Sequence, residues 1–178
     1  MSSPATRIRL FRGDITSLDC EAIVTAANGS LCGGGGVDGA VHAAAGPELV
    51  RASMVLGPCP TGEARITDGF KLNAKYVIHA VGPVFHDLKA SGPELASAYQ
   101  SSLLLTLERK IQSIAFPCIS TGVYGFPSAP ACEIAIETVF GWLESHETPQ
   151  SVTFCCFEYE DKKLYEKRMG ELGITGLS

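Results

Sequence analysis

Two glycine-rich stretches of the chain could bind an anion through backbone atoms. Four consecutive glycines, Gly33, Gly34, Gly35 and Gly36, directly precede an alanine-rich segment with helical spacing, and the stretch STGVYGFP at 120–127 also precedes such a segment. The first turn of a helix has N–H groups without helical partners, and its dipole favours negative charge. A phosphate can approach glycine closely, because glycine has no side chain. Two such loops facing each other would suit a diphosphate, although both could instead be flexible connectors.

The charge of the chain limits how a phosphate could be held. The 14 Lys and Arg residues are outnumbered by 19 Asp and Glu residues, which gives a net charge of −5. This balance disfavours nonspecific binding to nucleic acid, which depends on a basic surface. The GxxxxGK[ST] motif does not occur, and the GxGxxG spacing is met only at 34–39, inside the glycine run itself. A phosphate would therefore be held mainly by backbone N–H groups.

The elements that carry these loops alternate between strands and helices. We predict strands at 8–11, 21–27, 63–67, 75–81, 113–119 and 152–157, and helices at 37–56, 93–109, 130–145 and 160–169. Continuous apolar strands that alternate with helices predict a three-layer α/β/α domain with a central six-stranded sheet that is mixed but mostly parallel. Ligands bind at the carboxyl ends of the strands of such sheets, where both glycine-rich loops would lie.

Length, cysteines and termini limit the class of protein. A chain of 178 residues with 46% hydrophobic residues favours one domain, residues 1–178 with a core at about 7–170. The seven cysteines are odd in number and form no CxxC pair, which favours reduced thiols and no zinc site. The start, MSSPATR, has no apolar signal core, and no stretch reaches the roughly 20 apolar residues of a membrane span. We expect a cytoplasmic protein without membrane contact.

Six motifs carry a resemblance to a known family. They are RGDIT (12–16), VTAANGSL (24–31), GGGGVDGAVHAAAG (33–46), CPTGEARIT (59–67), YVIHAVGP (76–83) and FPCISTGVYGFP (116–127). In this order they resemble the macrodomain family, specifically its MacroD-type branch of ADP-ribose-binding hydrolases. The resemblance extends over residues 7–170 and implies the macrodomain fold, with no metal and no organic cofactor.

The resemblance also implies a reaction and its partners. We expect a hydrolase that removes mono-ADP-ribose from ester-linked acidic side chains of proteins and deacetylates O-acetyl-ADP-ribose. Nucleic acid would be a partner only as ADP-ribosylated ends. A non-catalytic reader of ADP-ribose would have the same pocket without turnover, and an interaction module with a vestigial pocket would not bind the nucleotide.

Three residues match the catalytic positions of the family. Asn28 resembles the asparagine that bonds the distal ribose, and Asp38 resembles the acid beside the anomeric carbon. A carboxylate can orient a water molecule and accept its proton, as ester hydrolysis requires. His42 follows Asp38 by four residues, on the same helical face, and could tune it through a hydrogen bond. Asp38 could alternatively be a carboxylate at the helix N-terminus that the helix dipole favours, and His42 could be purely structural.

The remaining positions implied by the resemblance would bind the ligand. Asp14 would accept a hydrogen bond from the adenine amine, Phe157 would stack on adenine, and Tyr124 would cover the distal ribose. The other ligand-binding positions are Ile15, Gly33, Gly34, Gly35, Gly36, Val37, Ser120, Thr121, Gly122, Val123 and Gly125. As alternatives, Asp14 could cap a turn, Phe157 could belong to the core, and Tyr124 could be an exposed residue without a role.

One position departs from the family pattern. The first asparagine of the NAAN motif of the family is Thr25 here. A threonine hydroxyl lacks the paired donor and acceptor of the amide, so its support of the neighbouring loop would be weaker. We expect this change to affect the rate more than the binding.

Overall fold

One sheet forms the centre of the molecule. The computed structural model describes residues 1–177, and these contain seven strands in one sheet with the order β3-β4-β2-β5-β6-β1-β7. The strands are β1 (Ile8–Arg12), β2 (Ala22–Ala26), β3 (Ala64–Asp68), β4 (Tyr76–Ala80), β5 (Ser113–Phe116), β6 (Ser151–Cys156) and β7 (Gly176–Leu177). Only β3 is antiparallel to its neighbour among these strands. The six predicted strands are all present, and the two-residue β7 at the edge was not predicted.

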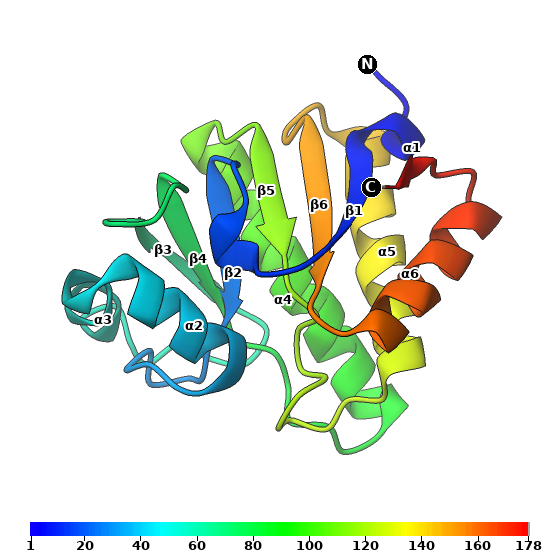
Figure 1. Cartoon of the computed structure of the whole chain (residues 1–178). Helices are drawn as coiled ribbons and strands as arrows, with labels where there is room; N and C mark the ends of the chain where they lie inside the picture. Colours follow the sequence, from blue (N-terminus) through cyan, green and yellow to red (C-terminus); the bar gives the residue numbers. More distant parts are fainter. Residues whose placement is uncertain (178) are drawn as a thin grey trace.

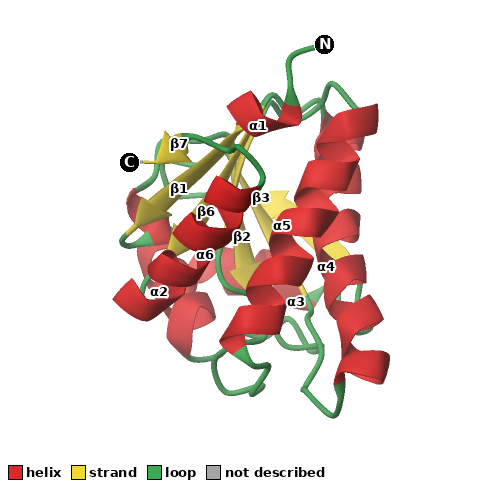
Figure 2. Cartoon of the chain, turned by 90° about the vertical axis from the view of Figure 1, so that its right-hand side faces the viewer, coloured by secondary structure: helices red, strands yellow, loops and turns green. Residues whose placement is uncertain are grey.

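Helices cover both faces of this sheet (Figures 1 and 2). They are α1 (Pro4–Arg7), the 3-10 helix η1 (Ile15–Ser17), α2 (Gly36–Ala45), α3 (Pro47–Met54), α4 (Leu88–Arg109), α5 (Ser128–Ser145) and α6 (Tyr159–Glu171). One hydrophobic cluster joins the sheet to η1, α2 and α3, and a larger one joins its other face to α4, α5 and α6. The predicted three-layer α/β/α architecture is confirmed. None of the described helices is long and apolar enough to cross a membrane.

The β2 strand shows why the strands are continuously apolar. Ala22 and Val24 belong to the cluster on the α4–α6 face, whereas Ile23 belongs to the cluster on the α2 face. Successive side chains of a strand point to opposite faces, so a sheet covered on both sides favours apolar residues on both faces of a strand.

Three predicted boundaries were wrong, each for a local reason. The predicted helix at 37–56 is two helices, because Gly46 has a φ of 88° and Pro47 follows it. The helix predicted from residue 93 begins five residues earlier, where Asp87 Oδ1 accepts a hydrogen bond from Ala90 N at 2.8 Å. The strand predicted at 113–119 ends at residue 116, since Pro117 cannot donate to the sheet.

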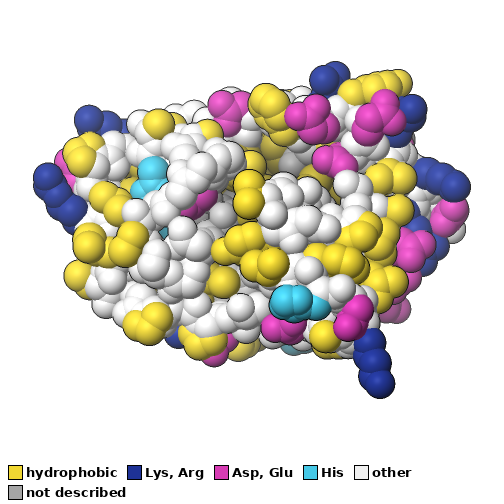
Figure 3. Space-filling view, turned by 90° about the horizontal axis from the view of Figure 1, so that it is seen from below, with side chains coloured by type: hydrophobic (Ala, Val, Ile, Leu, Met, Phe, Trp, Pro, Cys, Tyr) yellow, Lys and Arg dark blue, Asp and Glu magenta, His cyan; other side chains and the backbone are white. Residues whose placement is uncertain are grey.

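The parallel strands end at one edge of the sheet. The arrows of β1, β2, β5 and β6 all point toward the lower side of the molecule in Figure 1. Figure 3 views the molecule from that side, and its Lys and Arg side chains lie around the outline of the view, away from the middle. A ligand at the middle of this edge would therefore meet few Lys and Arg side chains.

Candidate functional site

The candidate residues follow four neighbouring strands. In the sheet, β2, β5, β6 and β1 are consecutive neighbours. Their ends lead to the glycine loop (33–36), to the second loop (120–127), to Phe157 and to Asp14. Strands lie about 4.8 Å apart, so these segments form a row roughly 14 Å long. The topology thus brings together segments that are far apart in the sequence.

Asn28 shapes the glycine loop from inside. Its Nδ2 donates a hydrogen bond to Gly33 O at 3.0 Å, and its Oδ1 accepts one from Ser30 Oγ at 2.6 Å. Gly33 and Gly36 have φ values of 88° and 55°, in the left-handed region that favours glycine. These two glycines therefore serve the course of the loop, beyond the close approach of a ligand.

The glycine loop continues directly into α2. Gly35 is the N-cap, and within residues 1–177 no side chain caps the helix there. The first N–H groups of α2 thus remain available to water or a ligand. Gly39 holds the helix close to the loop, because a Cβ atom at this position would lie only 2.8 Å from Gly34 O.

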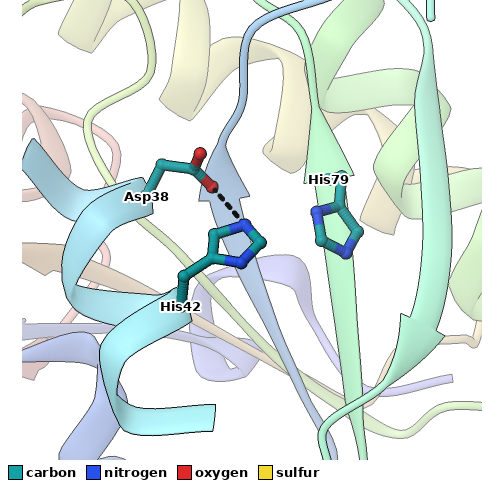
Figure 4. A group of neighbouring side chains, drawn as sticks. All are labelled: Asp38, His42 and His79. Atoms are coloured by element: carbon teal, nitrogen blue, oxygen red, sulfur yellow. Dashed lines mark ion pairs between the residues drawn. The ribbon is translucent and has the colours of Figure 1, made fainter. Parts of the chain in front are cut away.

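Asp38 is a buried carboxylate in the first turn of α2. The residue is 4% exposed, and its Oδ1 accepts a hydrogen bond from Thr25 Oγ1 at 2.9 Å. The Nε2 of His42 lies 3.5 Å from the same oxygen, as Figure 4 shows. Burial raises the pKa of Asp38, and the Thr25 hydrogen bond and His42 oppose this shift. The carboxylate is therefore partly desolvated but still held by two neighbours.

Asp38 and Asn28 converge on one glycine. A Cβ atom on Gly34 would lie 3.5 Å from Asn28 Nδ2 and 3.5 Å from Asp38 Oδ2. The second carboxylate oxygen thus faces the glycine loop, on the side of the asparagine amide. This arrangement provides a hydrogen-bond donor and a proton acceptor within reach of one small group.

His79, on β4, was missed by the sequence analysis. It is 1% exposed and faces His42, with 6.2 Å between the ring centroids (Figure 4). Its Nε2 lies 2.9 Å from Thr67 Oγ1 on β3. Burial, with a smaller contribution from His42, lowers the pKa of His79 to about 4, so its ring stays neutral. The sequence carried no signal for this contact, since His79 lies 37 positions after His42 and on a different element.

The second loop is closed by its own backbone. Phe126 N donates to Ser120 O at 2.9 Å, and Gly125 N donates to Gly122 O at 3.0 Å. Thr121 Oγ1 donates to Cys118 O at 3.1 Å. These bonds hold a compact turn that projects from the end of β5, with the side chain of the neighbouring Val123 fully exposed.

A segment after β4 supports this second loop and was also missed. Phe85 N donates to Tyr124 O at 2.8 Å. The rings of Phe85 and Phe126 pack edge to face, with 4.9 Å between their centroids. Gly82 lies directly beneath the loop, because a Cβ atom there would be 2.2 Å from Ser120 Oγ. Ser120 Oγ is buried and has no hydrogen-bond partner within the described residues. A larger residue at position 82 would displace the loop.

The far end of the row contains Asp14, Ile15 and Phe157. Asp14 Oδ1 accepts hydrogen bonds from Thr16 N at 2.9 Å and Thr16 Oγ1 at 2.7 Å, so the capping interpretation of Asp14 is correct. This leaves its second oxygen for another role. Ile15 is buried in the hydrophobic cluster around α2. Phe157 is 68% exposed, so the alternative that placed it in the core was wrong.

Comparisons with known proteins place this geometry in a family. A model of the macro domain matches residues 24–135. A macro domain-containing protein of Ralstonia nicotianae is 49% identical over 172 residues, which cover 96% of this chain and 99% of the relative. The chain belongs to the macro domain family. This confirms the family inferred from the motifs.

Relatives of this macro domain include proteins named ADP-ribose glycohydrolase MACROD2. Those of Mus musculus and Homo sapiens are each 51% identical, over 95% and 93% of this chain. The chain spans only 36% and 40% of their lengths. A mutant Oceanobacillus iheyensis macrodomain solved with ADPR has a TM-score of 0.92 and 38% identity, and the match covers 98% of both chains. A Trypanosoma brucei macrodomain in complex with ADP-ribose has a TM-score of 0.87 and 45% identity, over 92% of this chain and 69% of that chain.

Thr25 has a specific contact in this macro domain. The threonine is fully buried on β2, and its hydroxyl donates to the Asp38 carboxylate. The sequence analysis expected support of the loop at this position. The contact is instead with the acid itself, which makes Thr25 a direct determinant of the properties of Asp38.

Proposed function

We propose that this macro domain binds ADP-ribose along the row of loops at the carboxyl edge. The diphosphate would bind the N–H groups of the glycine loop and of the second loop. Asp14 and Phe157 would bind adenine at one end, and Asn28 and Tyr124 would bind the distal ribose at the other. Two features support this proposal, namely the uncapped start of α2 and the similarity to macrodomains solved with ADP-ribose.

We further propose that the domain hydrolyses esters of ADP-ribose. Its substrates would be mono-ADP-ribosylated acidic side chains of proteins and O-acetyl-ADP-ribose. One observation carries this proposal: the buried Asp38 carboxylate faces the glycine loop beside the Asn28 amide. The named activity of the MACROD2 relatives supports the same class of reaction.

The mechanism follows from the positions of these groups. Asn28 would hold the distal ribose, and Asp38 would orient a water molecule next to the ester. The water oxygen bonds to one carbon of the ester C–O bond as its proton passes to Asp38. That C–O bond breaks, and the departing oxygen takes the proton back from Asp38, which restores the carboxylate and releases ADP-ribose and the acid. A general base works best when its pKa lies near the working pH, and burial shifts Asp38 in that direction. A phosphate of the substrate could share the role of the base.

The test separates chemistry from binding. Release of ADP-ribose from an automodified mono-ADP-ribosylated target is measured for Asp38→Ala, and ADP-ribose binding is measured by calorimetry. Turnover should fall by about 10²-fold to 10⁴-fold, while the Kd changes little because the backbone N–H donors remain. Asp19→Ala, which removes an exposed carboxylate outside the site, is the matched control and should change neither quantity.

Other results of this test would change the role assigned to Asp38 or to the domain. Full turnover in Asp38→Ala would remove Asp38 as the base and favour the substrate phosphate. A parallel loss of binding and turnover would mean that Asp38 maintains the loop. Binding without turnover in the unmodified protein would identify a reader of ADP-ribose and contradict the proposed hydrolase.

A further inference from the structure

Three side chains from α2 and β4 form a cluster with metal-ligand chemistry. Asp38, His42 and His79 each offer one ligand atom, and these atoms all lie within 4.8 Å of one another. Figure 4 shows both imidazole rings and the carboxylate turned toward a common space between the helix and the strand. Imidazole and carboxylate ligands together suit zinc and other divalent transition metals.

The separation of Asp38 and His42 fits a bound ion better than a hydrogen bond. The Nε2 and Oδ1 atoms are 3.5 Å apart, beyond the usual 2.7–3.2 Å of N–H···O hydrogen bonds. Two ligands that each lie about 2.0–2.2 Å from a tetrahedral zinc ion are roughly 3.4 Å apart. The ligand atom of His79 lies within 4.8 Å of both, so it would approach by up to about 1.4 Å on this geometry.

The neighbours of His79 determine which of its nitrogens can bind an ion. Thr67 Oγ1 donates its single hydrogen to Asp68 O at 3.1 Å. With the hydrogen of Thr67 directed to Asp68 O, Thr67 Oγ1 is the acceptor in the 2.9 Å contact with His79, and His79 Nε2 carries the proton. The lone pair of the ring then belongs to Nδ1, the nitrogen that lies on the side of His42 in Figure 4. Such a hydrogen bond to the outer nitrogen commonly orients histidines that bind metals.

His42 is incompletely bonded and also accessible. Its Nδ1 is buried without a hydrogen-bond partner in the described part of the chain, while its Nε2 has only the long contact to Asp38. The side chain is 14% exposed and borders a hollow of about 480 Å³ lined also by Gly33 and Gly34. An ion could enter from this hollow and bond to a ring that is otherwise poorly satisfied.

We propose that Asp38, His42 and His79 form a binding site for a divalent transition metal such as Zn²⁺, and that the ion inhibits the domain. The ion would take up a lone pair of the Asp38 carboxylate, which could then no longer accept a proton from water. The inhibitory consequence rests on the proposed hydrolase function. The binding itself depends only on the three side chains.

The first experiment tests binding without any substrate. Chelator-treated protein is titrated with Co²⁺ and followed by visible absorption, and Zn²⁺ is then added to displace the Co²⁺. We expect one Co²⁺ per chain with the spectrum of nitrogen and oxygen ligands. Affinity should fall by at least about tenfold in His42→Gln and in His79→Gln. The matched control is His86→Gln, because His86 is exposed and lies outside the cluster.

The test uses both His42→Gln and His79→Gln, because one of the two variants could lose metal binding only through a loss of folding. His79 is buried, so thermal unfolding is measured for each variant, and the part-exposed His42 provides the decisive substitution if His79→Gln does not fold. Absence of Co²⁺ binding would overturn the proposal. So would a sulfur-to-cobalt charge-transfer band with unchanged affinity in His42→Gln, since the ion would then occupy cysteine thiols such as the Cys118 and Cys156 pair, whose Sγ atoms are 3.8 Å apart.

The second experiment tests inhibition. Turnover of the unmodified protein should fall as Zn²⁺ saturates the site and should return on addition of a chelator. Zinc binding with unchanged turnover would overturn the inhibitory role. If the protein has no turnover at all, the proposed function fails, while the Co²⁺ titration still decides whether the metal site exists.

Discussion

The hydrogen bond from Thr25 to Asp38 can be tested by its contribution to stability. Both side chains are buried, and the hydroxyl donates to the carboxylate at 2.9 Å. Thr25→Val keeps the shape of the side chain but removes this donor. Hydrogen bonds to charged groups contribute about 1.5–3 kcal/mol, whereas neutral ones contribute about 0.5–1.5 kcal/mol. We expect Thr25→Val to lower the free energy of unfolding by an amount in the first range.

Thr106→Val provides a matched control elsewhere in the core. Thr106 is also fully buried, but its hydroxyl donates to the helix carbonyl of Leu103 at 2.6 Å. The two substitutions exchange the same hydroxyl for the same methyl group, so the difference between them isolates the carboxylate. Urea unfolding at pH 8 with a chelator present should show a loss that is larger by about 1 kcal/mol for Thr25→Val.

A double-mutant cycle tests the charge directly. In an Asp38→Asn background the acceptor is a neutral amide oxygen, so Thr25→Val should then cost about 1 kcal/mol less than in the unmodified protein. Equal losses for Thr25→Val and Thr106→Val, together with a cycle that shows no coupling, would refute the reasoning. Thr25 would then be a packing residue, and its departure from the family asparagine would have no bearing on Asp38.

Four further outcomes are expected. Gly34→Ala should weaken ADP-ribose binding by about tenfold or more, because its methyl group occupies the space between the two catalytic candidates, whereas Gly141→Ala, in open space on α5, should not. Asp14→Asn should keep the turn cap, and so the unfolding free energy, but weaken ADP-ribose binding by roughly 1–3 kcal/mol without affecting ribose 5-phosphate, as paired calorimetric titrations would show. The affinity for ADP-ribose should fall less than about tenfold between low and physiological salt, since fixed backbone dipoles are screened less than surface charges. When the folded protein is treated with iodoacetamide at pH 8, mass spectrometry should find alkylation at the exposed Cys32. Cys155 should stay unmodified, because burial raises the pKa of its thiol to about 12.

The two glycine-rich loops were predictable because their signals are local. Glycine runs and helical spacing are properties of short segments, and so are continuous apolar strands. These signals were sufficient to predict the six longer strands, the layered architecture and the edge of the sheet where the candidate residues lie. The family motifs then assigned expected roles to Asn28 and Asp38.

Hydrophobic patterns in the sequence did not predict where a helix breaks or where a strand ends. The alanine-rich pattern at 37–56 continues across Gly46 and Pro47, so its period did not reveal the break between α2 and α3. The apolar run VTFCCF similarly suggested a core position for Phe157, although the strand ends one residue earlier and the ring is exposed. A turn of the backbone ends the helix in the first case and the strand in the second, and hydrophobicity alone does not predict such turns.

By itself, the sequence determined which segments become strands, helices and anion-binding loops, since neighbouring residues specify these. Only the tertiary structure decided which side chains meet. The order of strands places β4 beside β2 and β2 beside β5, and this order brings His79 and Thr25 to Asp38 and the second loop to the glycine loop. Many strand orders satisfy the same local pattern, and the packing of the whole sheet between its two helical layers selects one of them. The i, i+4 spacing already placed His42 beside Asp38, whereas the approach of His79 to this pair is a consequence of that selection.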